Sequence, residues 1–138
     1  MQKYADVTFN EGMAFDVEVN GHRFVIDAEE DVGGHDRGPR PKPLILVGLA
    51  GCTGMDVISI LRKMRVEPDY FNVVVSAEST SEHPVYYNKI HLEYQFRGNN
   101  LPMDKLEKAI NLSQNRYCGV SEMLRRSAEI TSEIKILE

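Results

Sequence analysis

The segment from Pro43 to Arg65 restricts the fold of this chain more than any other. It predicts one long helix, because proline suits the first turn and the cations Arg62 and Lys63 lie in the last turn, where they oppose the negative end of the helix dipole. The first half of the segment is apolar on every side, which is typical of a helix that is buried on most of its surface. We therefore expect a central, largely buried helix over residues 43–65.

Three glycines interrupt the apolar half of this helix. Gly48, Gly51 and Gly54 each cost roughly 1 kcal/mol of helix propensity relative to alanine. Two explanations for these glycines stay open: they permit close approach by another backbone, or they leave room for a ligand.

Runs of alternating apolar residues predict strands on both sides of the helix. Residues 1–28 contain three such runs, and Asn20-Gly21 is a strong hairpin signal because both positions tolerate a positive φ. Residues 29–42 are dense in glycine and proline and predict a loop without helix or strand. Residues 66–138 predict two strands, two helices and a final strand. The order βββα-ββααβ indicates the α+β class, in a single domain spanning residues 1–138.

Charge and composition argue against two classes of partner. The net charge of −5 is the wrong sign for a nucleic-acid surface, which needs clustered positive charge. The longest apolar stretch, Leu44 to Met55, is broken by glycines and is too short to span a bilayer, and the first residues lack the apolar run of a signal peptide. We therefore expect a soluble cytoplasmic protein that binds neither nucleic acid nor membrane, in which cysteines are reduced thiols or a redox pair.

Cys52 lies nine residues into the helix and needs help to become reactive. Asp56, one turn further on, disfavours the thiolate because like charges repel, and the helix dipole fades within the first turn. A reactive Cys52 therefore requires a cation from elsewhere. Arg37, Arg40 and Lys42 in the preceding loop are the candidates, and the sequence does not choose among them.

Cys118 stands in a different setting, at the start of a short predicted helix. Unpaired backbone amides at a helix start stabilise a thiolate, and Arg116 is close in sequence. The plainer interpretation is that each cysteine is a small buried hydrophobic residue. The two cysteines are 66 residues apart, and this spacing does not indicate whether their thiols are in contact. No HxxxH or CxxC pair exists and the four histidines are scattered, so we expect no metal site.

Two segments resemble motifs of the OsmC/Ohr hydroperoxide-resistance family. Residues 49–64, LAGCTGMDVISILRKM, resemble the central helix of that family, especially in its branch of small redox proteins. Residues 113–120, SQNRYCGV, look like its second cysteine motif. The order of elements matches as well, so the resemblance covers nearly the whole chain.

The resemblance implies an intertwined homodimer, with long central helices packed between sheets and active sites at the subunit interface. In the peroxidases of the family the first cysteine attacks an organic hydroperoxide and the second resolves it, which assigns these roles to Cys52 and Cys118. It also implies a small apolar substrate, a dithiol reductant, no cofactor and a part in oxidative stress defence.

Two departures from the family pattern bear on activity. The peroxidases activate the cysteine with an N-terminal arginine and with a glutamate in a Pro-Glu pair, which falls here on Pro41-Lys42. The first two strands contain no arginine. An alternative therefore stays open, a non-catalytic redox-sensing or small-molecule-binding protein on the same fold. A third interpretation is a structural dimer module whose cysteines only fill the core.

Overall fold

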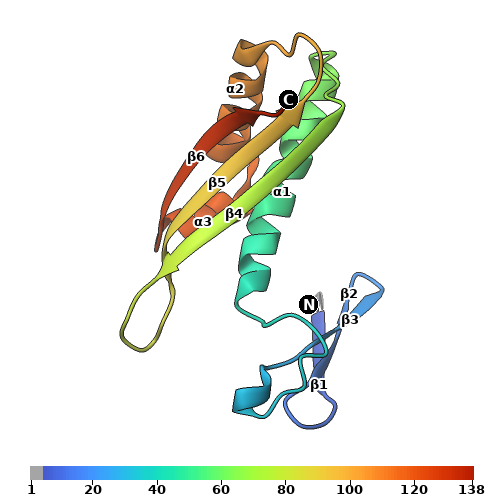
Figure 1. Ribbon diagram of the computed structural model, residues 1–138, viewed down its shortest axis with the longest axis vertical. Helices are drawn as coiled ribbons and strands as arrows, with labels where there is room; N and C mark the ends of the chain where they lie inside the picture. The colour runs from blue at the N-terminus through green and yellow to red at the C-terminus, as the bar shows by residue number, and fades with distance from the viewer. Residues whose placement is uncertain (1–4) are drawn as a thin grey trace. The chain divides into compact units, whose positions relative to one another are not determined.

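The computed structural model describes residues 5–138, and these residues form the predicted order of elements (Figure 1). The strands are β1 (Ala5–Phe9), β2 (Phe15–Val19), β3 (His22–Ile26), β4 (Tyr70–Ser79), β5 (Tyr87–Arg97) and β6 (Glu129–Ile136). The helices are α1 (Pro43–Lys63), α2 (Met103–Leu112) and α3 (Gly119–Arg125), with a 3-10 turn η1 (Glu30–Val32) and a π-helical turn η2 (Ser113–Tyr117). The order βββα-ββααβ and the α+β class are confirmed.

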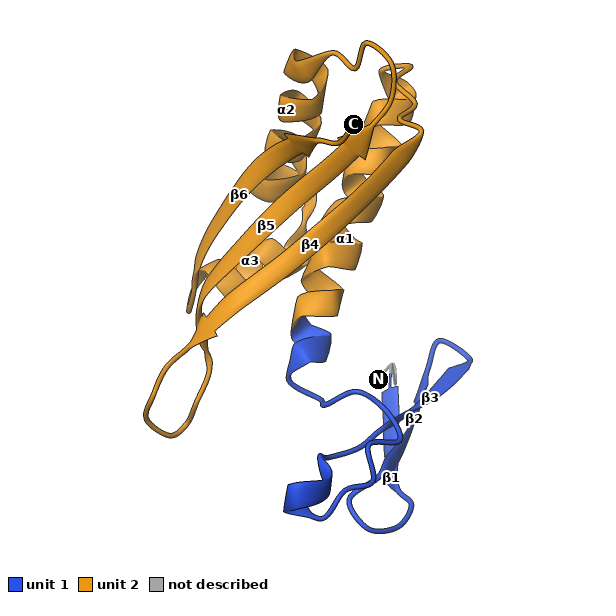
Figure 2. Ribbon diagram, viewed as in Figure 1, with its two compact units in different colours: residues 1–45 blue, residues 46–138 orange. Residues whose placement is uncertain are grey.

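The chain divides into two compact units, residues 1–45 and residues 46–138 (Figure 2). The boundary falls in the first turn of α1. Unit 1 therefore holds β1 to β3 and the loop that follows them, and unit 2 holds most of α1 and every later element. A single domain over residues 1–138 stays a prediction.

Unit 1 is built on an antiparallel sheet in the order β1-β2-β3. The turn between β2 and β3 lies at Asn20 and Gly21, whose φ values are 50° and 77°. Both residues are in the left-handed region, which is the geometry expected of an Asn-Gly hairpin turn. The three predicted strands are thus confirmed over the described residues, while Tyr4, which was included in the first predicted strand, lies outside them.

The loop after β3 is organised by the buried carboxylate of Asp27. It accepts hydrogen bonds from the backbone N–H groups of Ala28 at 2.8 Å, His35 at 3.1 Å and Arg37 at 3.2 Å, and from Arg37 Nε at 3.3 Å. Burial by itself raises the pKa of a carboxyl group, but these donors outweigh it and hold the pKa of Asp27 at about 2. The prediction of no helix in this loop was wrong for one 3-10 turn, Glu30–Val32.

Unit 2 packs α1, α2 and α3 on one face of a sheet in the order β4-β5-β6 (Figure 1). The β4 and β5 strands are antiparallel, whereas β5 and β6 are parallel. Parallel neighbours require a crossover, because a tight turn cannot join them. Here α2, η2 and α3 form that crossover, which brings residues 113–125 under the sheet and beside α1.

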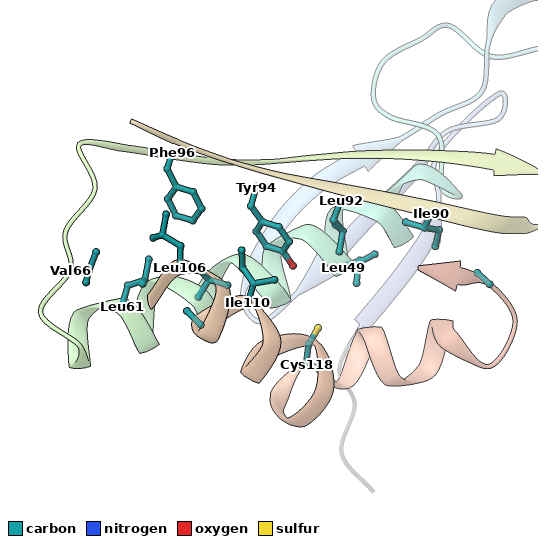
Figure 3. Close-up of a cluster of buried hydrophobic side chains, with 13 residues drawn as sticks. Leu49, Leu61, Val66, Ile90, Leu92, Tyr94, Phe96, Leu106, Ile110 and Cys118 are labelled. Carbon is teal, nitrogen blue, oxygen red and sulfur yellow. The ribbon is translucent and has the colours of Figure 1, made fainter. Parts of the chain in front are cut away.

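The core of unit 2 lies between β5 and the helices (Figure 3). The alternation in β5 points four residues to the helices, each at most 2% exposed: Ile90, Leu92, Tyr94 and Phe96. The buried face of α1 repeats every four residues and comprises Leu49, Thr53, Val57 and Leu61. Three of those four residues are apolar, so the single hydroxyl among them must find a buried hydrogen-bond partner.

The opposite side of α1 is apolar but uncovered in the single chain. Val47 is 63% exposed and Met55 is 78% exposed. By length and composition alone, α1 is the one helix among the described residues that could cross a membrane, as the core helices of many soluble proteins could. The expectation that the apolar stretch is too short considered only Leu44 to Met55, whereas α1 has 21 residues. The prediction of a helix buried on most sides therefore does not hold within one chain.

The Asp27 carboxylate gives a pH-dependent prediction for folding. Its pKa falls from an ordinary 3.8 to about 2 on folding, so its stabilising contribution is fully present above pH 4 and is lost as the pH falls toward 2. We expect Asp27→Asn to lower the free energy of unfolding in urea at neutral pH, because an amide turns an N–H group toward the donors of the loop. The difference between variant and wild type should shrink from pH 4 to pH 2.

Asp31→Asn is the matched control, since it removes an exposed carboxylate from the same loop. A difference between Asp27→Asn and wild type that stays constant down to pH 2 would contradict the proposed role of the Asp27 charge.

Candidate redox site

The structure brings the two cysteines together. The Sγ atoms of Cys52 and Cys118 and a carboxylate oxygen of Asp56 all lie within 4.8 Å of one another. Both cysteines are free thiols, with Cys118 buried and Cys52 half-buried. A disulfide needs sulfur atoms about 2 Å apart, so the two thiols must move closer by a modest distance before they can form one. Two residues that are far apart in the sequence thus share one site.

Local geometry places each of these groups. Cys52 and Asp56 are four residues apart on α1, so they project from the same face of that helix. Cys118 is brought to them by η2, the π-helical turn that follows α2 directly. The backbone N–H of Cys118 donates to the carbonyl of Ser113 at 2.7 Å and closes this turn. Single π-helical turns of this kind are frequent at functional sites.

Cys118 is the N-cap residue of α3. Its backbone is extended, with φ −76° and ψ 103°, and its sulfur accepts a hydrogen bond from the N–H of Ser121 at 3.4 Å. The prediction that Cys118 opens a short helix is confirmed. Arg116, considered as a neighbouring cation for Cys118, lies over the ring of Tyr117 at 5.5 Å from the centroid.

The surroundings of Cys52 favour the protonated thiol. Burial raises the pKa of Cys52, and the hydrogen bond with Cys118 and the charge of Asp56 raise it further. A backbone hydrogen bond from Val120 acts in the opposite direction but does not outweigh them. The predicted effect of Asp56 is confirmed in direction, although burial is the larger cause.

A buried chain of hydroxyl groups ends on Asp56. Ser113 Oγ donates to Asp56 Oδ2 at 3.0 Å, which uses the one proton of that hydroxyl. The 2.7 Å contact between Thr53 Oγ1 and Ser113 Oγ must then have Thr53 as donor. By the same argument Tyr94 O–H donates to Thr53 at 2.7 Å. All three protons therefore point along the chain toward the carboxylate beside the thiols.

Gln114 completes this network. Its side-chain Nε2 donates to Tyr94 Oη at 2.9 Å and to Thr53 Oγ1 at 3.1 Å, and its backbone carbonyl accepts from the guanidinium of Arg125 at 2.8 Å. The hydroxyls of Tyr94, Thr53 and Ser113 are fully buried, so each needs such partners. This network was not predicted from the sequence, although the polar pair Ser113-Gln114 within the second cysteine motif indicates buried hydrogen bonding there.

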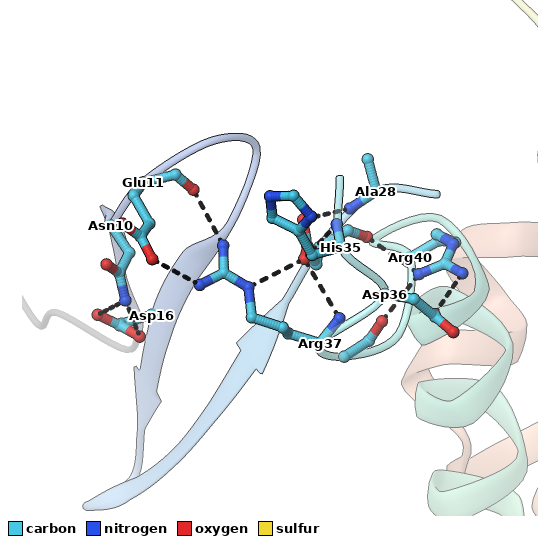
Figure 4. Close-up of polar contacts among 10 residues, drawn as sticks. Asn10, Glu11, Asp16, Ala28, His35, Asp36, Arg37 and Arg40 are labelled. Carbon is cyan, nitrogen blue, oxygen red and sulfur yellow. Dashed lines mark hydrogen bonds and ion pairs between the residues drawn. The ribbon is translucent and has the colours of Figure 1, made fainter. Parts of the chain in front are cut away.

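Arg37 and Arg40, two of the candidate activating cations, have carboxylate partners inside unit 1 (Figure 4). Arg37 pairs with Asp27 at 3.3 Å and with Glu11 at 3.1 Å. Arg40 pairs with Asp36 at 2.6 Å and donates to the carbonyl of Gly38 at 2.9 Å. The third candidate, Lys42, is exposed directly before α1.

Fold and site together define a small α+β thiol protein with a cysteine pair at the junction of two helices. The family model described as OsmC-like protein matches residues 34–133. The chain is 30% identical to the protein YhfA of Escherichia coli over 134 residues, which cover 96% of this chain and 97% of that protein. The chain therefore belongs to the OsmC-like family, as the sequence motifs indicated.

Solved structures show the same fold. A hypothetical protein from Aquifex aeolicus is 26% identical with a TM-score of 0.83, and the match covers 100% of this chain and 99% of that one. An organic hydroperoxide resistance protein from Legionella pneumophila is 12% identical with a TM-score of 0.72, covering 98% and 97% of the two chains.

The raised pKa of Cys52 can be tested by the rate of alkylation with iodoacetamide as a function of pH in the Cys118→Ser variant, which leaves one thiol. We expect the rate to rise only above the ordinary pKa of a cysteine, because burial and Asp56 both disfavour the thiolate. Adding Asp56→Asn should shift the profile to lower pH.

Adding Asp104→Asn to the same single-thiol variant is the control, because Asp104 is exposed on α2 and its loss should leave the profile unchanged. A profile that does not respond to Asp56→Asn contradicts this electrostatic account.

Proposed function

We propose that this protein reduces organic hydroperoxides through Cys52 and Cys118 with electrons from a dithiol. The observation that carries this proposal is the pair of free sulfurs within 4.8 Å of each other in a member of the OsmC-like family. The hydroperoxide resistance protein among its structural relatives supports the same role.

The proposed reaction proceeds in three steps: attack on the hydroperoxide, formation of the disulfide and reduction of the disulfide. The Cys52 thiolate attacks the O–O bond, the hydroperoxide is reduced to an alcohol, and Cys52 becomes a sulfenic acid. Cys118 then condenses with the sulfenic acid, which forms the disulfide and releases water. A dithiol reopens the disulfide by exchange and leaves as its own disulfide. Because Cys118 is already adjacent, resolution precedes overoxidation of Cys52.

The first step requires a cation that offsets the negative environment of Cys52. Arg37, Arg40 and Lys42 are the proposed candidates. Arg37 and Arg40 hold carboxylates of unit 1, so recruiting either of them would involve exchange of an ion pair. Lys42 stands where the family peroxidases carry glutamate.

A reducing cytoplasmic location, which would keep both thiols available, belongs to the same proposal.

A second candidate function is redox sensing or ligand binding without turnover. The raised pKa of Cys52 favours it, because a protonated thiol attacks peroxide slowly. A sensor would form the Cys52–Cys118 disulfide once per protein in peroxide without sustained consumption.

We further propose that a second copy of the chain covers the exposed side of α1. An apolar groove of residues from α1 and β4 runs along it: Val47, Ala50, Gly51, Gly54, Met55, Ile58, Phe71, Asn72 and Val73. A Cβ atom at Gly48 or Gly51 would meet no neighbour within 4 Å, which leaves space for another backbone. Unit 1 also exposes apolar residues of β1, with Phe9 at 59%. These surfaces support the intertwined homodimer that the family resemblance implies.

The peroxidase proposal is tested by consumption of cumene hydroperoxide with dithiothreitol as donor. We expect Cys52→Ser to reduce the rate to background, because it removes the attacking sulfur. In peroxide without the dithiol, Cys118→Ser should react about once and then gain further oxygen on Cys52, visible by mass spectrometry as sulfinic acid. Serine is a favoured N-cap residue, so this second variant keeps the start of α3.

Equal rates for wild type and Cys52→Ser would refute the peroxidase proposal. One disulfide per chain with no sustained consumption by wild type would support redox sensing instead.

The homodimer is tested by sedimentation of Met55→Glu at micromolar concentration. Burying an unpaired carboxylate costs several kcal/mol, so we expect the dimer to weaken by roughly a hundredfold or more. Met123→Glu is the matched control, since Met123 is 64% exposed on α3. A monomeric wild type, or a Met55→Glu variant that remains as dimeric as the control, would contradict the proposed interface.

A further inference from the structure

Cys52, Cys118 and Asp56 form a donor set suited to a thiophilic metal ion. One atom from each residue lies within 4.8 Å of the other two. A tetrahedral zinc ion takes sulfur at about 2.3 Å and carboxylate oxygen at about 2.0–2.2 Å, which places two bound sulfurs about 3.8 Å apart. The three atoms therefore need to move inward by about 1 Å or less to share an ion.

Two of the three groups are oriented by a hydrogen bond from their surroundings. Asp56 accepts from the buried hydroxyl of Ser113 at 3.0 Å, and the sulfur of Cys118 accepts from the N–H of Ser121 at 3.4 Å. Metal ligands are held in place by outer partners of this kind.

Charge and donor type select the ion. Two thiolates and one carboxylate carry three negative charges within a few ångström, and a divalent cation offsets two of them. Thiolate ligands favour zinc, cadmium and cobalt over magnesium and calcium, which prefer oxygen. Three protein ligands leave the fourth position of a tetrahedral ion for water or another small ligand.

We propose that the reduced protein binds one thiophilic divalent cation, such as Zn²⁺, through Cys52, Cys118 and Asp56. Such a site goes beyond the proposed peroxidase function and does not depend on it. It also departs from the expectation of no metal site, which considered only ligands closely spaced in the sequence. Disulfide formation removes two of the three ligands, so only the dithiol form binds the ion.

The proposal is tested by titrating the reduced, full-length protein with Co²⁺ in the absence of peroxide. We expect one ion per chain, with sulfur-to-cobalt charge-transfer absorption and the visible bands of tetrahedral cobalt, and displacement by Zn²⁺. Binding without charge-transfer absorption would overturn the proposal. Because no peroxide is present, failure of this experiment and failure of the peroxidase assay are separate results.

Variants test each ligand in turn. Asp56→Asn keeps an oxygen that accepts from Ser113 but removes the charge, and Cys118→Ser keeps the N-cap of α3. Each of these, and Cys52→Ser, should lower the affinity for Zn²⁺ by more than the roughly 10- to 100-fold that loss of an outer partner costs. Asp104→Asn, on the exposed surface of α2, should bind as wild type does. Wild-type affinity in Asp56→Asn would overturn the assignment of Asp56 as a ligand.

Discussion

The hydroxyl of Thr53 fixes how α1 packs against the sheet and the crossover, and the rest of unit 2 depends on that packing. It is fully buried in the otherwise apolar contact face of α1, where an unpaired hydroxyl would be costly. Its contacts to Tyr94 on β5, to Ser113 and to Gln114 satisfy it together, and they tie the register of α1 to both the sheet and the crossover. Cys52 directly precedes Thr53 in the chain. Satisfying that hydroxyl therefore also sets the position of the reactive sulfur.

Much of this architecture follows from patterns that can be read in the sequence. The Asn-Gly turn, the alternation in β5 and the span of α1 depend on local rules, and each was predicted with its type and approximate limits. The meeting of Cys52 with Cys118 could not be derived in this way, because it depends on a parallel strand pair and on the crossover that such a pair requires. The π-helical turn has no simple sequence signature. Pairing of Arg37 and Arg40 with carboxylates of unit 1 likewise arises from loop geometry that composition does not specify.

The electrostatics of the site are the main restraint on its chemistry. Burial, the second thiol and the Asp56 carboxylate raise the pKa of Cys52, which favours the thiol over the more reactive thiolate. A positive charge, whether an arginine, a lysine or a metal ion, would reverse that preference. Lys42 and Asp56 are therefore the residues of this chain whose charges bear most directly on how the cysteine pair reacts.

The position of Cys118 as an N-cap links sulfur chemistry to the order of the backbone. α3 has only seven residues, and a helix this short has little stability of its own. Its first turn relies on the sulfur as acceptor for Ser121, and β6 begins four residues after the helix ends. Any reaction that turns the sulfur away from that N–H loosens the start of the helix and, through it, the entry to the parallel edge of the sheet. The chemical state of one sulfur and the order of the first turn of α3 are therefore linked through a single hydrogen bond.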